Sequence, residues 1–514
     1  MHRWWGHTAL IGKCHGRGMK VASASLALLT VGFPRAGAAG DRRAPSAAVR
    51  IAAMERAREA AIGHTALPAA ATLAPATPST LGHVRDIQEI SRDPLTAQPG
   101  AGADTEVEPD IAADPRHHNR LLAVVQQGRF RTGGAQAIGY ANSVNGGHRW
   151  DRATLPGLTS AQGGRFARAS DPSVAFAPHG SAYAAALAFD VSGCQSAVAV
   201  WRSDDGGRSF GDLVLADRTC NAADDKPWIG VDTSSESHYH GRIYLVWTRY
   251  AGTRGAIALR YSDDQAATWS PLVVVSTPPA DTIDFGALPL IEPSGALIVG
   301  YQSVSLDVGT SQVLVQASTD GGTTFADPVA VSDFMGSDEP DLRSGANIAG
   351  SVDPRTGALY VAWQDGRFRT DGLNDIVVAR STDGGVNWSS PRRVNRRGPD
   401  VLVDHFTPAI AALDEVVLAC YRTRRLSPNP SAFVAMVCSS SPNGGRSWGA
   451  DRLIGHPTDL TYSATLLGGL RFLGDYMGLA VTRTSFHPAW CHAYRPRRSH
   501  APHHQTTWTA TVRS

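Results

Sequence analysis

The sequence has no excess of charge of either sign. Its 514 residues include 48 Lys and Arg against 46 Asp and Glu, which gives a net charge of +2, and only 18% of the residues are charged. Proteins that bind nucleic acid or a membrane surface through a broad basic field need a strong positive excess. The composition therefore argues against both classes, and we expect no nucleic-acid partner.

A hydrophobic run long enough to span a bilayer is also missing near the N-terminus. The apolar stretch Val21–Phe33 has about 13 residues, whereas a transmembrane helix needs roughly 20. It follows four basic residues and precedes Ala36-Gly37-Ala38, the order typical of a secretory signal. We predict a signal peptide over residues 1–39, with a short membrane anchor as the alternative. The mature chain is then secreted or periplasmic, without membrane insertion.

The segment that follows has little sign of regular structure. Residues 40–80 are rich in Ala, Pro and Thr, a composition typical of a linker. Residues 81–514 then form the folded domain, which is long enough to bury a large core.

Cysteine is scarce, with six in the whole chain. Cys14 belongs to the predicted signal peptide. Because an exported chain meets an oxidising compartment, we expect the disulfides Cys194–Cys220 and Cys420–Cys438 and an unpaired Cys491. Buried free thiols are the alternative for all five.

Common catalytic and cofactor motifs are absent. The chain has no G-x-S-x-G elbow, no phosphate-binding loop and no H-E-x-x-H motif, and its histidine pairs lack the spacing of zinc ligands. We therefore predict no metal site and no cofactor, although the acidic loops leave Ca²⁺ binding open.

A short turn sequence is present in six related copies. The intervals between their serines are 60, 59, 56, 63 and 60 residues, a period typical of a repeated supersecondary unit. The copies are Ser143–Trp150, Ser203–Phe210, Ser262–Trp269, Ser318–Phe325, Ser381–Trp388 and Ser441–Trp448.

Each copy has residues suited to a tight turn. The Asp or Asn accepts hydrogen bonds from backbone N–H groups, the second Gly takes a positive φ, and the aromatic residue packs under the hairpin. The third copy has Gln265-Ala266 where glycines are expected, so we expect its turn to differ in shape. In the fifth unit, the predicted strands are Ala346–Val352, Ala358–Gln364, Asp375–Ser381 and Pro391–Val394.

Repeated units of four antiparallel strands favour an all-β fold of the β-propeller type. The pattern S-x-[DN]-x-G-x-x-[WF] resembles the Asp-box, or BNR, repeat of the sialidase (neuraminidase) superfamily, over roughly residues 105–455. The resemblance implies a propeller that hydrolyses terminal sialic acids with a Tyr nucleophile polarised by Glu, an Asp acid/base and three arginines. The Arg-Ile-Pro signature carrying the first arginine is absent, and Glu108-Pro109-Asp110-Ile111 stands near its place.

The chain ends supply one more unit. Leu470–Val481, Phe486–His492 and Thr506–Val512 read as three strands without a fourth, and His83–Ser91 reads as a single strand ahead of the first unit. Pairing that strand with the other three predicts a seventh blade. Six blades with additional strands at the ends are the alternative.

Chain topology separates the two faces of such a propeller. The first strand of each unit begins, and the second ends, on the face opposite the Asp boxes, and acids and arginines recur at these positions. Arginines bind carboxylates, and paired carboxyl groups cleave glycosides. The predicted catalytic residues are Asp110, Asp341, Asp404, Asp475 and Tyr476. The predicted substrate-binding residues are Arg129, Arg249, Arg343, Arg367, Arg422 and Trp228.

The sequence thus predicts an exported, monomeric protein that acts on an acidic glycan, as a sialidase-like glycoside hydrolase if it is an enzyme. A non-catalytic carbohydrate- or protein-binding scaffold is one alternative, since one fold serves many functions. A polysaccharide lyase with a Tyr or His base is the other.

Overall fold

The computed structural model describes residues 81–252, 254–306, 311–345, 347–396, 402–427, 429–496 and 502–513. The predicted signal peptide and linker lie outside the described residues. Within these ranges the chain is built from β-strands with three short 3₁₀ turns and no α-helix, which confirms the all-β class. No helix here has the length and apolar character needed to cross a membrane.

Most strands follow one another in antiparallel groups of four. Group 1 has β2 (Glu106–Ala113), β3 (Leu121–Arg129), β4 (Ala135–Ser143) and β5 (Asp151–Thr154), and group 2 has β6 (Arg168–Phe176), β7 (Ala182–Phe189), β8 (Ser196–Ser203) and β9 (Val214–Thr219). Group 3 has β10 (Ala223–Val231), β11 (Ile243–Ala251), β12 (Arg254–Ser262) and β13 (Val273–Val274), and group 4 has β14 (Thr282–Ile291), β15 (Leu297–Ser305), β16 (Ser311–Ser318) and β17 (Val329–Asp333). Group 5 has β19 (Ala349–Val352), β20 (Leu359–Asp365), β21 (Asp375–Ser381) and β22 (Arg392–Arg393), and group 6 has β23 (Val403–Leu413), β24 (Val416–Arg425), β25 (Phe433–Ser441) and β26 (Arg452–Leu453).

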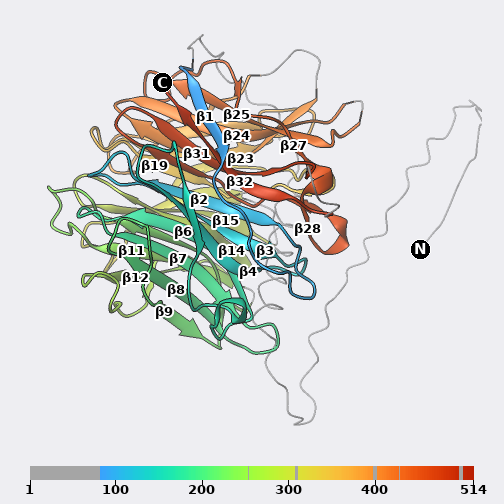
Figure 1. Ribbon diagram of the computed structural model, residues 1–514. Coiled ribbons are helices and arrows are strands. Elements are labelled where there is room, and N and C mark those ends of the chain that lie inside the picture. The colour runs from blue at the N-terminus through green and yellow to red at the C-terminus, as the bar shows by residue number, and fades with distance from the viewer. Residues whose placement is uncertain are drawn as a thin grey trace, which may run out of the picture. The chain divides into compact units, whose positions relative to one another are not determined.

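The two ends of the described chain share one further sheet, here called the terminal sheet. Its order is β1 (Val84–Glu89), β32 (Gln505–Val512), β31 (Phe486–Ala493) and β30 (Gly478–Val481). Val84 pairs with Val512 and Glu89 with Trp508. Figure 1 shows blue β1 among the red and orange strands of the C-terminal part. The expected pairing between the chain ends is therefore present.

The first strands of the groups contact one another in chain order. β2 contacts β6, β6 contacts β10, and the series continues through β14, β19 and β23 to β30, which contacts β2. Residues from these first strands line one cavity of about 190 Å³, here called the central cavity. Apart from Asp110, the side chains that line it are aliphatic or aromatic.

All six box turns share one set of hydrogen bonds. In the fifth copy, the Ser381 hydroxyl donates to the Asp383 carboxylate over 2.8 Å and accepts the Gly385 N–H over 3.0 Å. The third copy repeats both contacts, over 2.8 Å from Ser262 to Asp264 and 3.0 Å from the Ala266 N–H. The expectation of a different turn there was wrong. Gln265 and Ala266 instead adopt positive φ values of 64° and 69°.

The second glycine of each glycine-containing box also lies close to a neighbouring residue. A Cβ added to Gly207 would lie 3.0 Å from Leu122 of group 1, and one added to Gly445 would lie 3.6 Å from Tyr360 of group 5. For Gly147 of group 1, the Nδ1 atom of His487 in the terminal sheet would be 3.7 Å away. The box turns therefore connect neighbouring groups, including the first group and the terminal sheet.

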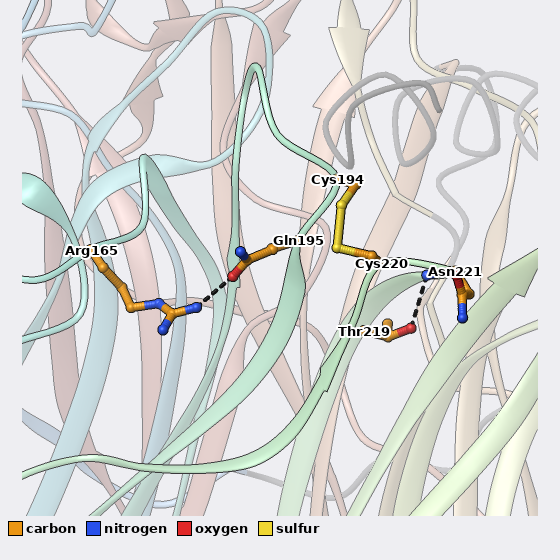
Figure 2. The surroundings of a disulfide bond; sticks show 6 residues. All are labelled: Arg165, Cys194, Gln195, Thr219, Cys220 and Asn221. Carbon is orange, nitrogen blue, oxygen red and sulfur yellow. Dashed lines mark hydrogen bonds between the residues drawn. A yellow bond between two sulfur atoms is a disulfide. The ribbon is translucent and has the colours of Figure 1, made fainter. Parts of the chain in front are cut away.

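Both expected disulfides are present, Cys194–Cys220 and Cys420–Cys438, and Cys491 is a buried free thiol. Figure 2 shows the first bond, which joins the β7–β8 connection to the β9–β10 connection. The second joins two residues that face each other on β24 and β25.

Candidate functional site

A bulge recurs near the start of the first strands and places polar side chains there. Glu108, Asp171, Lys226 and Thr407 have φ values of 57°, 50°, 48° and 50°, and each is followed by a proline. The strand register shifts at these points. A non-glycine residue in this region costs about 1–2 kcal/mol, and bulges re-aim side chains. Proline removes the N–H that a bulge would leave unpaired.

Three predicted arginines surround a buried pair of carboxyl groups, Glu108 and Asp475. We call these five residues the arginine–carboxylate cluster. Arg343 Nε donates to Asp475 over 2.9 Å, and the Asp475 N–H donates to Glu108 over 3.3 Å. Arg422 donates to the carbonyl oxygens of residues 473 and 474. Burial, and then the charge of Asp475, raise the pKa of Glu108, while Arg129 and Arg343 oppose that rise.

A cation and two aromatic rings lie beside the cluster. Lys226 Nζ is 4.4 Å from the ring centre of Trp228 and 5.2 Å from that of Tyr476, and the two rings meet edge to face at 5.1 Å. The Tyr476 hydroxyl donates to the carbonyl oxygen of Pro172 over 2.8 Å. Burial lowers the pKa of Lys226 to about 8 although Asp171 opposes this. Burial, then Glu108, raise the pKa of Tyr476, so its hydroxyl stays protonated.

Asp110 lines the central cavity together with Trp228 and Tyr476. Its carboxylate accepts the Val174 N–H over 2.9 Å. Burial raises the pKa of Asp110 to about 7, and the nearby charge of Lys226 only partly opposes this. The carboxyl group is therefore about half protonated near neutral pH.

A small three-stranded sheet contributes side chains to the cluster. It consists of β18 (Leu342–Arg343), β29 (Arg471–Phe472) and β28 (Ala464–Thr465), in that order. The Phe472 ring lies 4.8 Å from the Arg129 guanidinium carbon and 5.4 Å from that of Arg343. Glu108, Asp475 and Arg422 are all buried. We call this sheet the cap sheet.

Two predicted acids lie in a different cluster. Arg424 Nη1 donates to Asp341 over 2.8 Å and to Glu339 over 3.4 Å. Asp404 is buried and accepts the N–H groups of Asn374 and His405. Burial and the adjacent Asp404 raise the pKa of Glu339. Neither Asp341 nor Asp404 lines the central cavity.

Arg249 and Arg367 pair with carboxylates outside the arginine–carboxylate cluster. Arg249 donates to Asp224 over 2.8 Å and also contacts Asp217. Arg367 Nη2 donates to Asp365 over 2.7 Å. Of the predicted residues, the structure therefore groups Arg129, Arg343, Arg422, Asp110, Asp475, Tyr476 and Trp228, and places the remaining four elsewhere.

Sequence reasoning missed Glu108 and Lys226 as site residues, and it missed Glu339 and Arg424 as members of the separate cluster around Asp341 and Asp404. The first two carry a signal that could have identified them, since each precedes a proline at the start of a first strand. The other two depend on contacts between distant segments. No group of three His, Cys, Asp or Glu side chains in the described ranges is arranged to hold a metal ion.

No family model matches the chain. Among solved structures, similarity is found to a Hadza microbial sialidase at 13% identity and a TM-score of 0.44, covering 85% of this chain and 94% of the other. A GH93 α-L-arabinofuranosidase of Fusarium graminearum has 12% identity and a TM-score of 0.39, covering 67% and 93%. A PL25 ulvan lyase has 14% identity and a TM-score of 0.48, covering 81% and 97%. These values assign the chain to none of the three families.

Proposed function

We propose that the strand groups form a closed seven-bladed β-propeller in which β1 completes the terminal sheet as the seventh blade. The series of contacts between first strands, which returns from β30 to β2, supports closure. The contact between the first box turn and the terminal sheet supports it as well, because Gln88 Nε2 donates to the Gly147 carbonyl over 2.6 Å. A closed ring leaves few exposed strand edges.

We further propose that the protein is exported and acts on an acidic glycan at the face where the first strands begin. The observation that carries this proposal is the meeting of Arg129, Arg343 and Arg422 at the Glu108–Asp475 pair, beside Tyr476. Arginine binds carboxylates through two parallel hydrogen bonds, which suits a sugar acid. The two disulfides support an oxidising compartment.

The environments of the acids suit different roles. Glu108 and Asp110 have raised pKa values through burial, so each can hold a proton near neutral pH and serve as a general acid. Asp475 is paired with Arg343 and would act as the base or as a charge that stabilises the oxocarbenium-like transition state. Tyr476 has a raised pKa and donates its hydroxyl proton to the Pro172 carbonyl, so it would need a base to become a nucleophile; if Glu108 is that base, Asp110 is left as the general acid.

Access to this site requires the cap sheet to move. The five residues of the arginine–carboxylate cluster do not line the central cavity, whose volume of about 190 Å³ is also smaller than the roughly 300–1,000 Å³ typical of ligand pockets. Phe472 contacts two of the three arginines. A shift of β29 would move Phe472 away from these guanidinium groups, and it would also move Arg343 on the paired strand β18 and the carbonyl groups that Arg422 binds.

The decisive experiment compares two arginines that both satisfy the sequence pattern. Fluorogenic sialosides and uronides are the substrates, and release of their fluorophore is measured for the wild type, Arg343→Ala and Arg367→Ala. Arg343→Ala should lose at least about 100-fold in kcat/KM, since losing one charged contact costs several kcal/mol. The kcat/KM of Arg367→Ala should stay within about threefold of the wild-type value, because Arg367 contacts Asp365 and Ser332 and not the cluster. No turnover by the wild type would contradict a hydrolase, and equal losses for the two variants would contradict catalysis at the arginine–carboxylate cluster.

A second candidate is binding without turnover. It is favoured by the partners that the cluster already has inside the protein, such as Asp475 for Arg343 and two carbonyl groups for Arg422. Binding of acidic sugars without release of product would establish this candidate. An unsaturated product that absorbs in the ultraviolet would instead indicate a lyase.

A further inference from the structure

A second cavity, of about 840 Å³, lies at one end of the terminal sheet, and we call it the terminal hollow. It lies at the same end as the start of β2, because Gln505 of β32 forms a bridge with Thr105 and its side chain donates to the Glu106 carbonyl over 2.7 Å. The lining residues that matter for binding are Glu89, Arg92, Asp104, His492, Tyr494 and Trp508.

Aromatic rings form one wall of the hollow. Tyr494 stacks on His492, with ring centres 5.2 Å apart and an angle of 21° between the planes. Trp508 meets His492 edge to face at 5.0 Å, and its indole N–H donates to Thr506. Tyr494 and Trp508 are half-buried. Their rings are fixed by these contacts, and part of their apolar surface faces the hollow. Such rings bind flat apolar faces with little loss of conformational freedom.

Charged groups lie beside this aromatic wall, since Glu89, Arg92 and Asp104 also line the hollow. Glu89 accepts hydrogen bonds from the Tyr494 hydroxyl over 2.8 Å and from Arg92 Nη2 over 3.0 Å, and Arg152 lies 3.6 Å away. Arg92 also donates through Nε to Glu89 over 3.2 Å, whereas Arg152 lies outside the lining. The Arg92 side chain is 62% exposed, so its remaining N–H groups can reach a ligand. Asp104 is paired with His504.

We infer that the terminal hollow is a binding site for a uronic-acid polysaccharide, separate from the arginine–carboxylate cluster. A uronic acid has an apolar ring face, which fits the wall of Tyr494 and Trp508, and a carboxylate, which fits Arg92. The volume is within the range of ligand pockets. The inference rests on the proposed function only for the ligand class, since it needs no catalysis.

Affinity electrophoresis of the full chain in gels containing polygalacturonate, alginate or hyaluronan tests the site, with uncharged dextran as the ligand control. The variants are Arg92→Ala and Trp508→Ala, with Arg446→Ala as the matched control. Arg446 is also an exposed arginine, but it lies in a box turn, where it contacts Asn443. We expect retardation of the wild type by at least one uronate polymer and not by dextran. The apparent Kd should rise at least about tenfold for Arg92→Ala and Trp508→Ala and stay unchanged for Arg446→Ala.

Three results would overturn the inference: no retardation of the wild type, unchanged retardation of Arg92→Ala, or equal losses for Arg92→Ala and Arg446→Ala. Trp508 is part of a strand, and Trp508→Ala could therefore fail to fold. In that case the retardation of Arg92→Ala, a substitution at an exposed residue, is the deciding measurement. Arg343→Ala separates the two proposals. If it abolishes turnover of small uronides and leaves retardation unchanged, both proposals stand. If Arg343→Ala alone abolishes retardation, the hollow is not the binding site although the proposed function survives.

Discussion

Replacing Asp110 by Asn should remove the contribution of this one carboxyl group to the pH dependence of stability. The folded state holds the Asp110 carboxyl at a pKa of about 7, against 3.8 for the free group, because the side chain is buried. A carboxyl group with a raised pKa favours the folded state at low pH, and this contribution is lost as the pH rises through the folded pKa. Asn keeps an acceptor for the Val174 N–H but has no proton to lose.

The size of the effect follows from the shift. About three pKa units correspond to roughly 4 kcal/mol, of which about 3 kcal/mol falls between pH 5 and pH 8. We therefore expect the difference in free energy of unfolding, Asp110→Asn minus wild type, to increase by about 3 kcal/mol as the pH rises from 5 to 8. Urea denaturation followed by tryptophan fluorescence at pH 5, 6, 7 and 8, with the disulfides intact, measures it.

The control is Asp383→Asn in the fifth box turn. Hydrogen bonds from the backbone and side chain of Asn387 lower the pKa of Asp383, so its contribution to stability is present at neutral pH and is lost in acid. Its curve should approach the wild type as the pH falls towards 3. If Asp110→Asn and the wild type instead give parallel curves from pH 5 to pH 8, the burial argument for Asp110 is wrong.

Three further predictions concern the fold. Gln265→Gly should raise the free energy of unfolding by about 0.5–1 kcal/mol, because glycine relieves the positive φ of an exposed residue; Gln265→Ala, which keeps a Cβ, should not. Replacing Cys420 and Cys438 together by Ala should cost about 3 kcal/mol in urea denaturation, since their bond closes a separation of 18 residues, and the loss should disappear when both proteins are compared under reducing conditions. Deleting residues 81–91 should lower the melting temperature and promote aggregation by leaving β32 as an open edge; a melting temperature within one degree of the wild type would contradict closure through β1.

The repeating elements could be predicted because their signals are local. In group 5, the predicted strand Asp375–Ser381 matches β21, and Ala358–Gln364 lies within one residue of β20 at each end. The predicted Leu470–Val481 was less accurate, because the chain there divides between β29 in the cap sheet and β30 in the terminal sheet. Alternation of apolar and polar residues shows that a segment is extended, but not which sheet it joins.

The third box turn shows the limit of residue preference. Gln265 and Ala266 predicted a changed turn, yet the Ser262–Asp264 hydrogen bond and the Ala266 N–H contact keep the geometry of the other copies. Ala266 is also buried in the core beside Trp247. The hydrogen bonds and the packing together outweigh about 1–2 kcal/mol of backbone strain per residue.

The site was only partly predictable because its contacts join distant segments. Arg343 and Asp475 are 132 residues apart in the chain, and no local pattern relates them. Arg367, at the end of an expected second strand, was predicted on the same face as Arg343, at the start of an expected first strand, but it has a carboxylate two residues away at Asp365. A nearby partner in the sequence is thus a reason to place an arginine outside a shared site.

The same reasoning bears on what the central cluster is for. Glu108 occupies a strained backbone conformation, with φ at 57°, inside a buried group of charges, and both features cost free energy. Burial of the aromatic and aliphatic side chains of neighbouring strands could close the ring without them, since group 4 has Gly286 at the corresponding bulge. Charges that the architecture does not require, held together beneath a small separate sheet, favour a role in binding over a role in folding. Glu108→Gln keeps the shape of the side chain but has no charge and no proton to give, so it should leave the melting temperature equal or higher, leave binding of acidic sugars equal or tighter, and lower their turnover. A large loss of stability would instead make the cluster structural.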